Sequence, residues 1–256
     1  EIIEEVKHYF SNNPEPDYIT FSGSGEPTLN IRIGEIIDFL KSSYPKVPVA
    51  VLTNGTLFYD SEVRKSLLLA DLVVPSLDAA TLKTFLRIDR PEKSINLEDY
   101  INGLVKFRQE YKNKIWLEVF ILPGYNDNLE DITALKEAIK RINPDLIQLN
   151  SMDRPGCLTN LEVASIETLN KIIEICGFDN VEIISKSKAR EEIKSYRKDV
   201  EGHIIETIAR RPSPVENIAE ITGYHLSELM KYIHTLENQG KITSTLLNDK
   251  VFYKIK

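Results

Sequence analysis

The sequence predicts an α/β fold in which a parallel barrel, or part of one, precedes a smaller domain. Two observations predict the barrel. Short apolar runs alternate with amphipathic helical patterns over residues 1–185. Several runs, such as residues 47–52, are nearly continuously apolar, which is typical of parallel strands covered by helices. A charged connector at 186–198 then separates this region from a domain at 199–256.

The chain opens on a helical pattern. Ile2, Ile3, Val6 and Phe10 form an apolar stripe, and no capping residue precedes them. Since a helix that covers a parallel sheet follows a strand, we expect such a strand to precede residue 1.

Six apolar runs rich in β-branched residues are expected to form the strands. They are residues 17–21, 47–53, 72–77, 115–122, 146–150 and 181–184.

Helices are expected between these strands, where apolar residues recur every three or four positions. They are residues 31–43, 60–70, 80–86, 97–111, 129–142 and 165–177.

Composition limits the classes of function. At 42% hydrophobic and 28% charged, the 256 residues can bury a full core. No apolar run approaches the roughly 20 residues of a membrane span, so we expect a cytoplasmic protein with no membrane partner. A net charge of -7 means that any nucleic-acid contact needs a local basic patch. Cys157 and Cys176 lack the spacing of a metal motif and are expected to be free thiols.

Polar residues are concentrated where the expected strands end. In parallel barrels the active site lies at these carboxyl ends, so we expect the residues to line one mouth. A second reading is that some are helix N-caps, but a carboxylate inside a strand, as at Glu118, needs a buried partner. The candidates are Ser22, Gly23, Ser24, Gly25, Glu26, Thr53, Asn54, Ser76, Asp78, Glu118, Leu122, Gln148 and Asn150.

Four strand-end motifs in order resemble the radical S-adenosylmethionine (radical SAM) enzymes, and within them the wyosine-related iron-sulfur oxidoreductases. The motifs are FSGSGEPTL at 21–29, LTNGTL at 52–57, PSLDAA at 75–80 and LPGYND at 122–127. The resemblance covers about residues 1–185 and implies a partial (β/α)6 TIM-type barrel that lacks its first strand. It also implies a 4Fe-4S cluster that binds S-adenosylmethionine and releases a 5'-deoxyadenosyl radical.

The resemblance also implies roles for the candidate residues. Residues 22–26 match the motif that holds the methionyl ammonium, and Thr53 and Asn54 lie near methionine and ribose. Ser76 and Asp78 match the residues that meet the ribose hydroxyls. Glu118 is a weaker match for a cofactor-side residue, and the residues that flank adenine are Leu122, Gln148 and Asn150.

The sequence departs from this family in one respect. The cluster loop CxxxCxxC is absent, and Cys157 and Cys176 lie 19 residues apart, so the chain alone supplies no ligand set for a cluster. We expect the ligands upstream of residue 1 and the chain without them to be inactive. An electron donor such as a ferredoxin or flavodoxin is the implied partner.

Substrate contacts are expected from Arg154 and Tyr125 at the same rim. Arg154 equally suits an internal ion pair, and Tyr125 could simply pack. Arg87 and Arg90 are interpreted as a solvated helix end, with contact to a carboxylate or phosphate as the alternative.

The second domain resembles a winged helix. Helices are expected near residues 204–209, at 215–222 and at 226–239, with a hairpin of 242–247 and 251–255. From Asp199 onward there are eight acidic and seven basic residues. The expected recognition helix has two glutamates and one lysine, which favours a protein-contact or structural module over a DNA reader.

Three hypotheses stay open. The first is a radical SAM enzyme that acts on RNA, protein or a small molecule. The second is a barrel that binds a nucleotide-like ligand without radical chemistry. The third is a regulator whose barrel senses a metabolite and whose winged-helix-like domain binds DNA or a protein. A tRNA contact through Arg210, Arg211 and Lys241 is a further alternative.

Overall fold

The computed structural model describes residues 2–12, 15–23, 25–152, 161–184, 200–224, 226–248 and 250–256. The chain divides into two compact units, and each is treated by itself. The first comprises residues 1–151 and 164–184, and the second comprises 152–163 and 185–256. None of the described helices combines the length and the apolar character that crossing a membrane requires.

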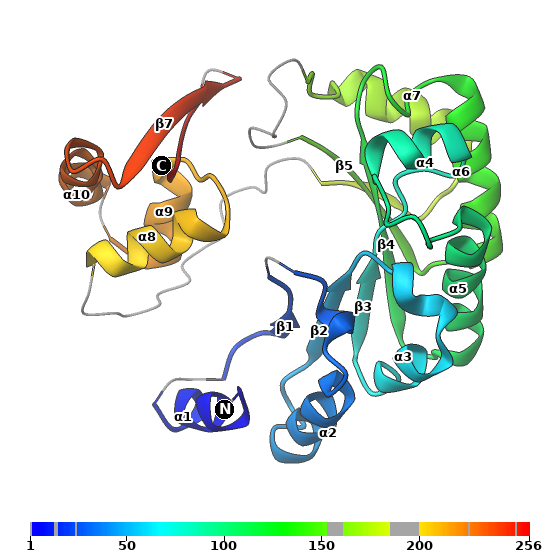
Figure 1. The fold of residues 1–256 in the computed structure, drawn as a ribbon, viewed down its shortest axis with the longest axis horizontal. Helices are drawn as coiled ribbons and strands as arrows, with labels where there is room; N and C mark the ends of the chain where they lie inside the picture. The colour runs from blue at the N-terminus through cyan, green and yellow to red at the C-terminus, as the bar shows by residue number, and fades with distance from the viewer. Residues whose placement is uncertain are drawn as a thin grey trace. The chain divides into compact units, whose positions relative to one another are not determined.

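The first unit is built on one parallel sheet whose strands are ordered as they follow in the chain, from β1 to β6 (Figure 1). All six expected strands are confirmed, with small shifts at their ends. They are β1 (Ile19–Phe21), β2 (Val49–Thr53), β3 (Leu72–Pro75), β4 (Lys114–Ile121), β5 (Leu146–Ser151) and β6 (Val181–Ile183).

The expected helices are also present, and the chain does begin with one. The helices are α1 (Ile2–Asn12), α2 (Ile33–Ser43), α3 (Ser61–Ser66), α4 (Leu82–Ile88), α5 (Leu97–Glu110), α6 (Leu129–Ile142) and α7 (Ile166–Cys176), with short 3-10 helices η1 (Pro27–Leu29) and η2 (Thr56–Tyr59). Helix α3 is shorter than predicted. The N–H groups of Leu67, Leu68 and Ala70 donate to carbonyls three residues back, so the last turns tighten instead of continuing the α-helix.

The two faces of the sheet differ in what covers them. Along β4, Ile115, Leu117 and Val119 are buried in the main core, which they share with the helices that cover one side of the sheet (Figure 1). Because side chains alternate along a strand, Trp116, Glu118 and Phe120 share the other, inner face. They are only half-buried there.

The parallel register sets polar residues side by side on the inner face. Ser76, just beyond β3, bridges to Glu118 on β4, and Glu118 pairs with Gln148 on β5. Two residues further along both strands, Phe120 pairs with Asn150. The inner face therefore becomes polar toward the carboxyl ends of the strands.

Gly103 sets how closely α5 packs on η2. A Cβ atom built at Gly103 would lie 2.7 Å from the backbone carbon of Phe58 and 2.8 Å from the backbone nitrogen of Tyr59. We expect Gly103→Ala to lower the free energy of unfolding by about 1–3 kcal/mol, because the helix must move away. Urea denaturation measures this loss, and Lys106→Ala, on the exposed side of α5, should change the unfolding free energy by less than about 0.5 kcal/mol. Equal effects of the two changes would contradict the packing argument.

The second unit contains the three helices and the hairpin that the sequence predicts. The helices are α8 (Val200–Arg210), α9 (Val215–Thr222) and α10 (Leu226–Asn238), and the strands are β7 (Ile242–Leu247) and β8 (Lys250–Ile255). Ile204, Ile218 and Ile233 from the three helices meet Ile242 of β7 in a separate core. On its other edge β8 pairs with Ser213, so that three short segments lie side by side.

Candidate functional site

Glu26 joins the ends of β1 and β2. Its Oε1 accepts hydrogen bonds from the Thr28 N–H at 3.0 Å, the Thr28 hydroxyl at 2.6 Å and the Thr53 hydroxyl at 2.5 Å. Its Oε2 accepts the N–H of Asn54 at 2.7 Å. A carboxylate oxygen has two lone pairs, so this Oε2 retains acceptor capacity for one more donor.

The serine-glycine loop before Glu26 is open to its surroundings. Ser22, Gly23 and Gly25 are exposed, and a Cβ built at either glycine meets nothing within 4 Å. Gly23 has a φ of 154°, which L side chains rarely adopt. Ser24, a candidate, lies outside the described residues. The loop is thus free to place its backbone against a ligand.

Tyr100, on α5, connects the ends of β2 and β3 through its hydroxyl group. Its buried hydroxyl donates to the carbonyl of Asn54 at 3.0 Å and also reaches the carbonyl of Ser76. Burial raises the pKa of Tyr100 well above its usual value, so it stays a neutral donor. The sequence interpretation missed this residue, because Tyr100 falls within the apolar stripe of a helix and its pattern predicts only core.

Glu118 lies half-buried on the inner face. The Asn150 amide donates to Glu118 Oε1, and the Ser76 hydroxyl also bonds the carboxylate. Burial raises the pKa of Glu118, and these two hydrogen bonds offset only part of the rise. Thus Ser76, Glu118 and Asn150, which the sequence analysis expects at one mouth, form one hydrogen-bonded cluster across three strands.

Asp78 follows β3 at the same edge of the sheet. Its Oδ1 accepts the Phe120 N–H at 2.8 Å. Desolvation, with the negative charges of Asp89 and Glu118, raises the pKa of Asp78 to about 7. Desolvation also raises the pKa of Asp89, at the end of α4, to about 6. Three carboxyl groups therefore influence one another here, and Asp89 was not among the predicted residues.

Asn126 holds the loop after β4 in place and is fully buried. Its Oδ1 accepts the Leu122 N–H at 2.8 Å, while its Nδ2 donates to the carbonyls of Asp78 at 2.8 Å and Phe120 at 2.7 Å. Its amide thus ties the loops that carry Leu122 and Asp78 to each other.

We expect Asn126→Ala to lower the free energy of unfolding by about 2–4 kcal/mol, because three backbone groups lose their partner. Thermal or urea unfolding measures this, and Asn170→Ala, at an exposed site on α7, is the matched control. A loss no larger than that of the control would mean that Asn126 does not hold the two loops.

Of the two residues predicted to contact substrate, the structure describes only Tyr125. The Tyr125 ring lies 3.6 Å from the guanidinium carbon of Arg87, whose Nη1 donates to the Gly124 carbonyl at 2.9 Å. Tyr125 thus stacks on a cation of its own chain, and Arg87 is not merely a solvated helix end. Arg154 lies outside the described residues. Leu122 is buried and Gln148 is half-buried beside Glu118.

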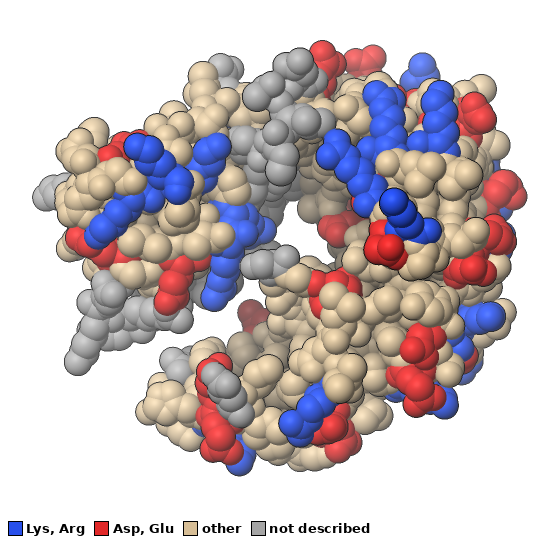
Figure 2. Space-filling model, viewed as in Figure 1, with Lys and Arg blue, Asp and Glu red and all other residues tan. Residues whose placement is uncertain are grey.

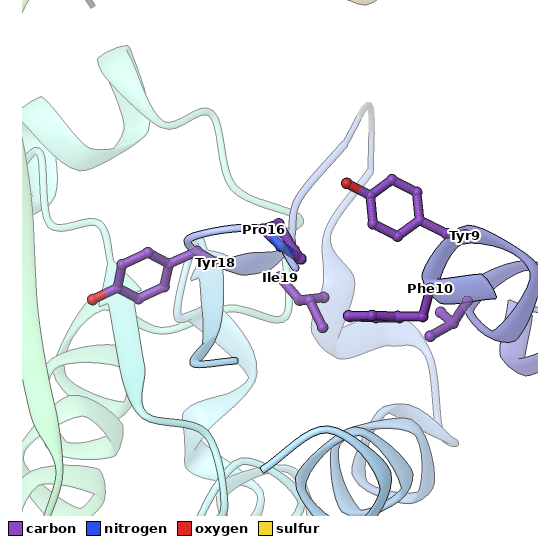
Figure 3. Close-up of a pocket in the computed structure, with 6 residues that line it drawn as sticks. Tyr9, Phe10, Pro16, Tyr18 and Ile19 are labelled. Carbon is purple, nitrogen blue, oxygen red and sulfur yellow. The ribbon is translucent and has the colours of Figure 1, made fainter. Parts of the chain in front are cut away.

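An apolar cavity of about 250 Å³ lies away from these residues, at the amino end of β1. Figure 3 shows Phe10 of α1 directed toward Ile19, and Tyr9, Pro16 and Tyr18 also contribute to the lining. Its lining provides only tyrosine hydroxyls as side-chain polar groups. We therefore place the candidate site at the opposite, carboxyl end of the strands.

The described residues offer no ligand set for a cluster. No group of three or more His, Cys, Asp or Glu side chains suited to a metal occurs in the part of the chain that is described. Cys176 is a free thiol buried in the core of the first unit, and Cys157 falls outside the described residues. The side chains at the described strand ends are carboxylates, hydroxyls and amides, which chemically suit a cationic, hydroxyl-bearing ligand.

Comparison with known proteins gives a match to one family model and to several proteins. The model of a family described as the radical SAM superfamily matches residues 1–138. A protein named GTPase Obg from Brachyspira hyodysenteriae is 35% identical over 256 residues, which is 100% of this chain and 38% of that protein. A UPF0026 protein from Methanocaldococcus jannaschii is 30% identical over 246 residues, covering 94% of this chain and 75% of that protein.

A solved structure shares the fold of the first unit. It is a domain of pyruvate-formate lyase-activating enzyme from Bacteroides vulgatus, with a TM-score of 0.53 and 18% identity. The match covers 66% of this chain and 100% of that domain.

Proposed function

Since this chain belongs to the radical SAM superfamily, we propose that it binds S-adenosylmethionine across the carboxyl ends of β1 to β5 and serves its reductive cleavage. The 5'-deoxyadenosyl radical would then abstract hydrogen from a substrate that is RNA, a protein or a small molecule. The observation that carries the proposal is the joining of five strand ends by hydrogen bonds. Glu26 joins β1 to β2, Tyr100 joins β2 to β3, and Glu118 joins β3, β4 and β5.

The hydrogen-bonded carboxylate of Glu26 fits an ammonium group. Four protein donors hold the carboxylate without a cationic side chain among them, so the carboxylate keeps its charge available for a ligand. Ser22, Gly23 and Gly25 lie on the same loop and are exposed. We assign this loop to the methionyl end of the ligand.

The cluster of Ser76, Asp78, Glu118 and Asn150 fits the ribose end and the positive sulfonium. Hydroxyl and carboxylate groups suit ribose hydroxyls, and the raised pKa values of Asp78 and Glu118 indicate carboxylates that lack a compensating cation. A cationic ligand would lower both pKa values. Leu122 and Gln148 are assigned to the adenine.

A reduced 4Fe-4S cluster, when bound, supplies the electron that cleaves the sulfonium. Because the described residues provide no such ligand set, we propose that thiolates of a CxxxCxxC segment outside the printed sequence supply it. The residues at the strand ends bind and orient the ligand.

Finer assignments complete the proposal. The strand-end motifs support the wyosine-related branch and an oxidoreductase, and a ferredoxin or flavodoxin would donate the electron. The domain boundaries at 185 and 199 and the winged-helix character of the second unit are part of the same proposal, supported by the order of α8, α9, α10, β7 and β8.

The test is to express the chain with its upstream residues, reconstitute iron and sulfide anaerobically, reduce the protein and measure 5'-deoxyadenosine. We expect 5'-deoxyadenosine to form slowly from S-adenosylmethionine, in turnover that is not coupled to a substrate. A well-formed cluster that yields none would contradict radical chemistry and leave the ligand-binding barrel as the function, which calorimetry with S-adenosylmethionine would then examine.

A further inference from the structure

Charge in the second unit is segregated, although its sum is close to zero. Residues 210–211 and 241–256 contain six basic residues and one acidic residue. The rest of residues 200–256 contains six acidic residues and one basic residue. A count over the whole domain therefore hides a strongly basic part.

The fold brings the basic residues of distant segments to one end of a small sheet. Ser213 and Tyr253 exchange backbone hydrogen bonds of 3.0 and 2.9 Å, which places Arg211 beside the end of β8. On the other side of β8, the Lys256 N–H donates to the Lys241 carbonyl at 3.2 Å. We call Arg210, Arg211, Lys241, Lys254 and Lys256 the basic edge.

The side chains of the basic edge are exposed. Among the ion pairs of the described residues, one involves the basic edge, from Lys241 to Glu201 at 4.0 Å. At that distance and exposure the pair contributes little, so the positive field is only weakly neutralised. Figure 2 shows Lys and Arg side chains gathered on the visible face of this unit.

We propose that the basic edge binds the phosphate backbone of RNA. Repeated phosphates match several exposed cations on adjacent segments, and the half-buried Thr243, paired with Lys254, adds a hydroxyl donor. Duplex DNA is disfavoured because α10, the helix that would enter the major groove, carries Glu228 and Glu237 against one lysine. The contact uses the hairpin and the end of α8 instead of α10.

The test measures binding of a fluorescein-labelled 24-nucleotide RNA hairpin to the full chain by anisotropy, over a range of salt concentrations. The variant is Arg211→Ser/Lys254→Ser/Lys256→Ser. Its control is Lys46→Ser/Lys106→Ser/Lys171→Ser, which removes three exposed charges from the first unit. We expect the variant to bind about tenfold more weakly at 0.1 M salt, with a salt slope smaller by about 2, and the control to change affinity less than twofold.

Three outcomes would overturn the proposal. They are equal losses in the two triple variants, tighter binding of a DNA duplex of the same sequence, and competition by poly-glutamate as effective as that by unlabelled RNA at equal charge. Circular dichroism establishes that both variants are folded. The assay needs neither cluster nor S-adenosylmethionine, so its failure is distinct from failure of the proposed enzymatic function.

Discussion

Replacing Glu26 by Gln is expected to weaken S-adenosylmethionine binding by roughly 10- to 100-fold, the value of a hydrogen bond between charged groups. The carboxylate accepts four hydrogen bonds from Thr28, Thr53 and Asn54, and its remaining acceptor capacity is assigned to the ligand ammonium. Glutamine has a similar shape but no charge, and its amide nitrogen cannot accept the Asn54 N–H. Calorimetry measures the affinity, and the yield of 5'-deoxyadenosine from the reconstituted protein measures the consequence.

The matched control is Glu35→Gln, which removes a carboxylate of the same kind from α2. Glu35 is exposed on α2 and pairs with Arg32 at 2.6 Å, and among the described residues it has no hydrogen bond to a strand end. It should leave affinity unchanged. If Glu26→Gln binds the ligand as tightly as the control while remaining folded, the serine-glycine loop does not hold the ammonium group.

The sequence predicted the fold of the first unit well, because its signals are local. Apolar runs such as β2 are continuous, and helices such as α6 have clear caps, since the Asn128 side chain accepts the Asp131 N–H and Asn143 ends the helix in the left-handed conformation. The error at α3 is local too. Its apolar pattern continues through Leu67 and Leu69, yet the hydrogen bonds there are of the 3-10 type.

The site was predictable only as a set of strand ends. Parallel topology brings Ser76, Glu118 and Asn150 to one edge whatever their individual roles, so their proximity follows from the order of the strands. The helix and loop residues that hydrogen-bond to these strand ends have no such pattern in the sequence. Tyr100 has the pattern of a core residue and Asn126 that of a turn residue, and only the three-dimensional structure shows their hydrogen bonds.

The basic edge, too, could not be predicted as a whole from the sequence. Residues 210–211 and 241–256 are about thirty positions apart, and a sum over the domain cancels their charge against the acidic helices. Backbone pairing of Ser213 with Tyr253 brings them together. A charge count thus indicates binding only after the topology is known.

The second large effect concerns pH and Asp78. With a pKa of about 7, Asp78 is largely protonated at pH 6, and a cationic ligand must displace that proton. We therefore expect the association constant for S-adenosylmethionine to rise up to tenfold per pH unit between pH 6 and 7 and to level off above it, where the carboxylate is already ionised. Calorimetry from pH 5.5 to 7.5 measures the profile.

Two variants distinguish the effect of Asp78 itself from that of its charged neighbour. Asp78→Asn should bind the ligand at least tenfold more weakly at pH 7.5, with a nearly flat profile, because no proton is displaced at that position. Asp89→Asn removes a negative neighbour that helps to raise the pKa of Asp78, so the midpoint of the binding profile should move to lower pH with affinity retained at pH 7.5.

The stability of the ligand-free protein should depend on pH in the opposite direction to ligand affinity. The contribution of Asp78 to its unfolding free energy falls as pH rises from about 4 to 7, because the folded state keeps a proton on Asp78 that the unfolded chain has released, and the difference between wild type and Asp78→Asn measures it. A wild-type profile that Asp78→Asn leaves unchanged would place the titrating group elsewhere.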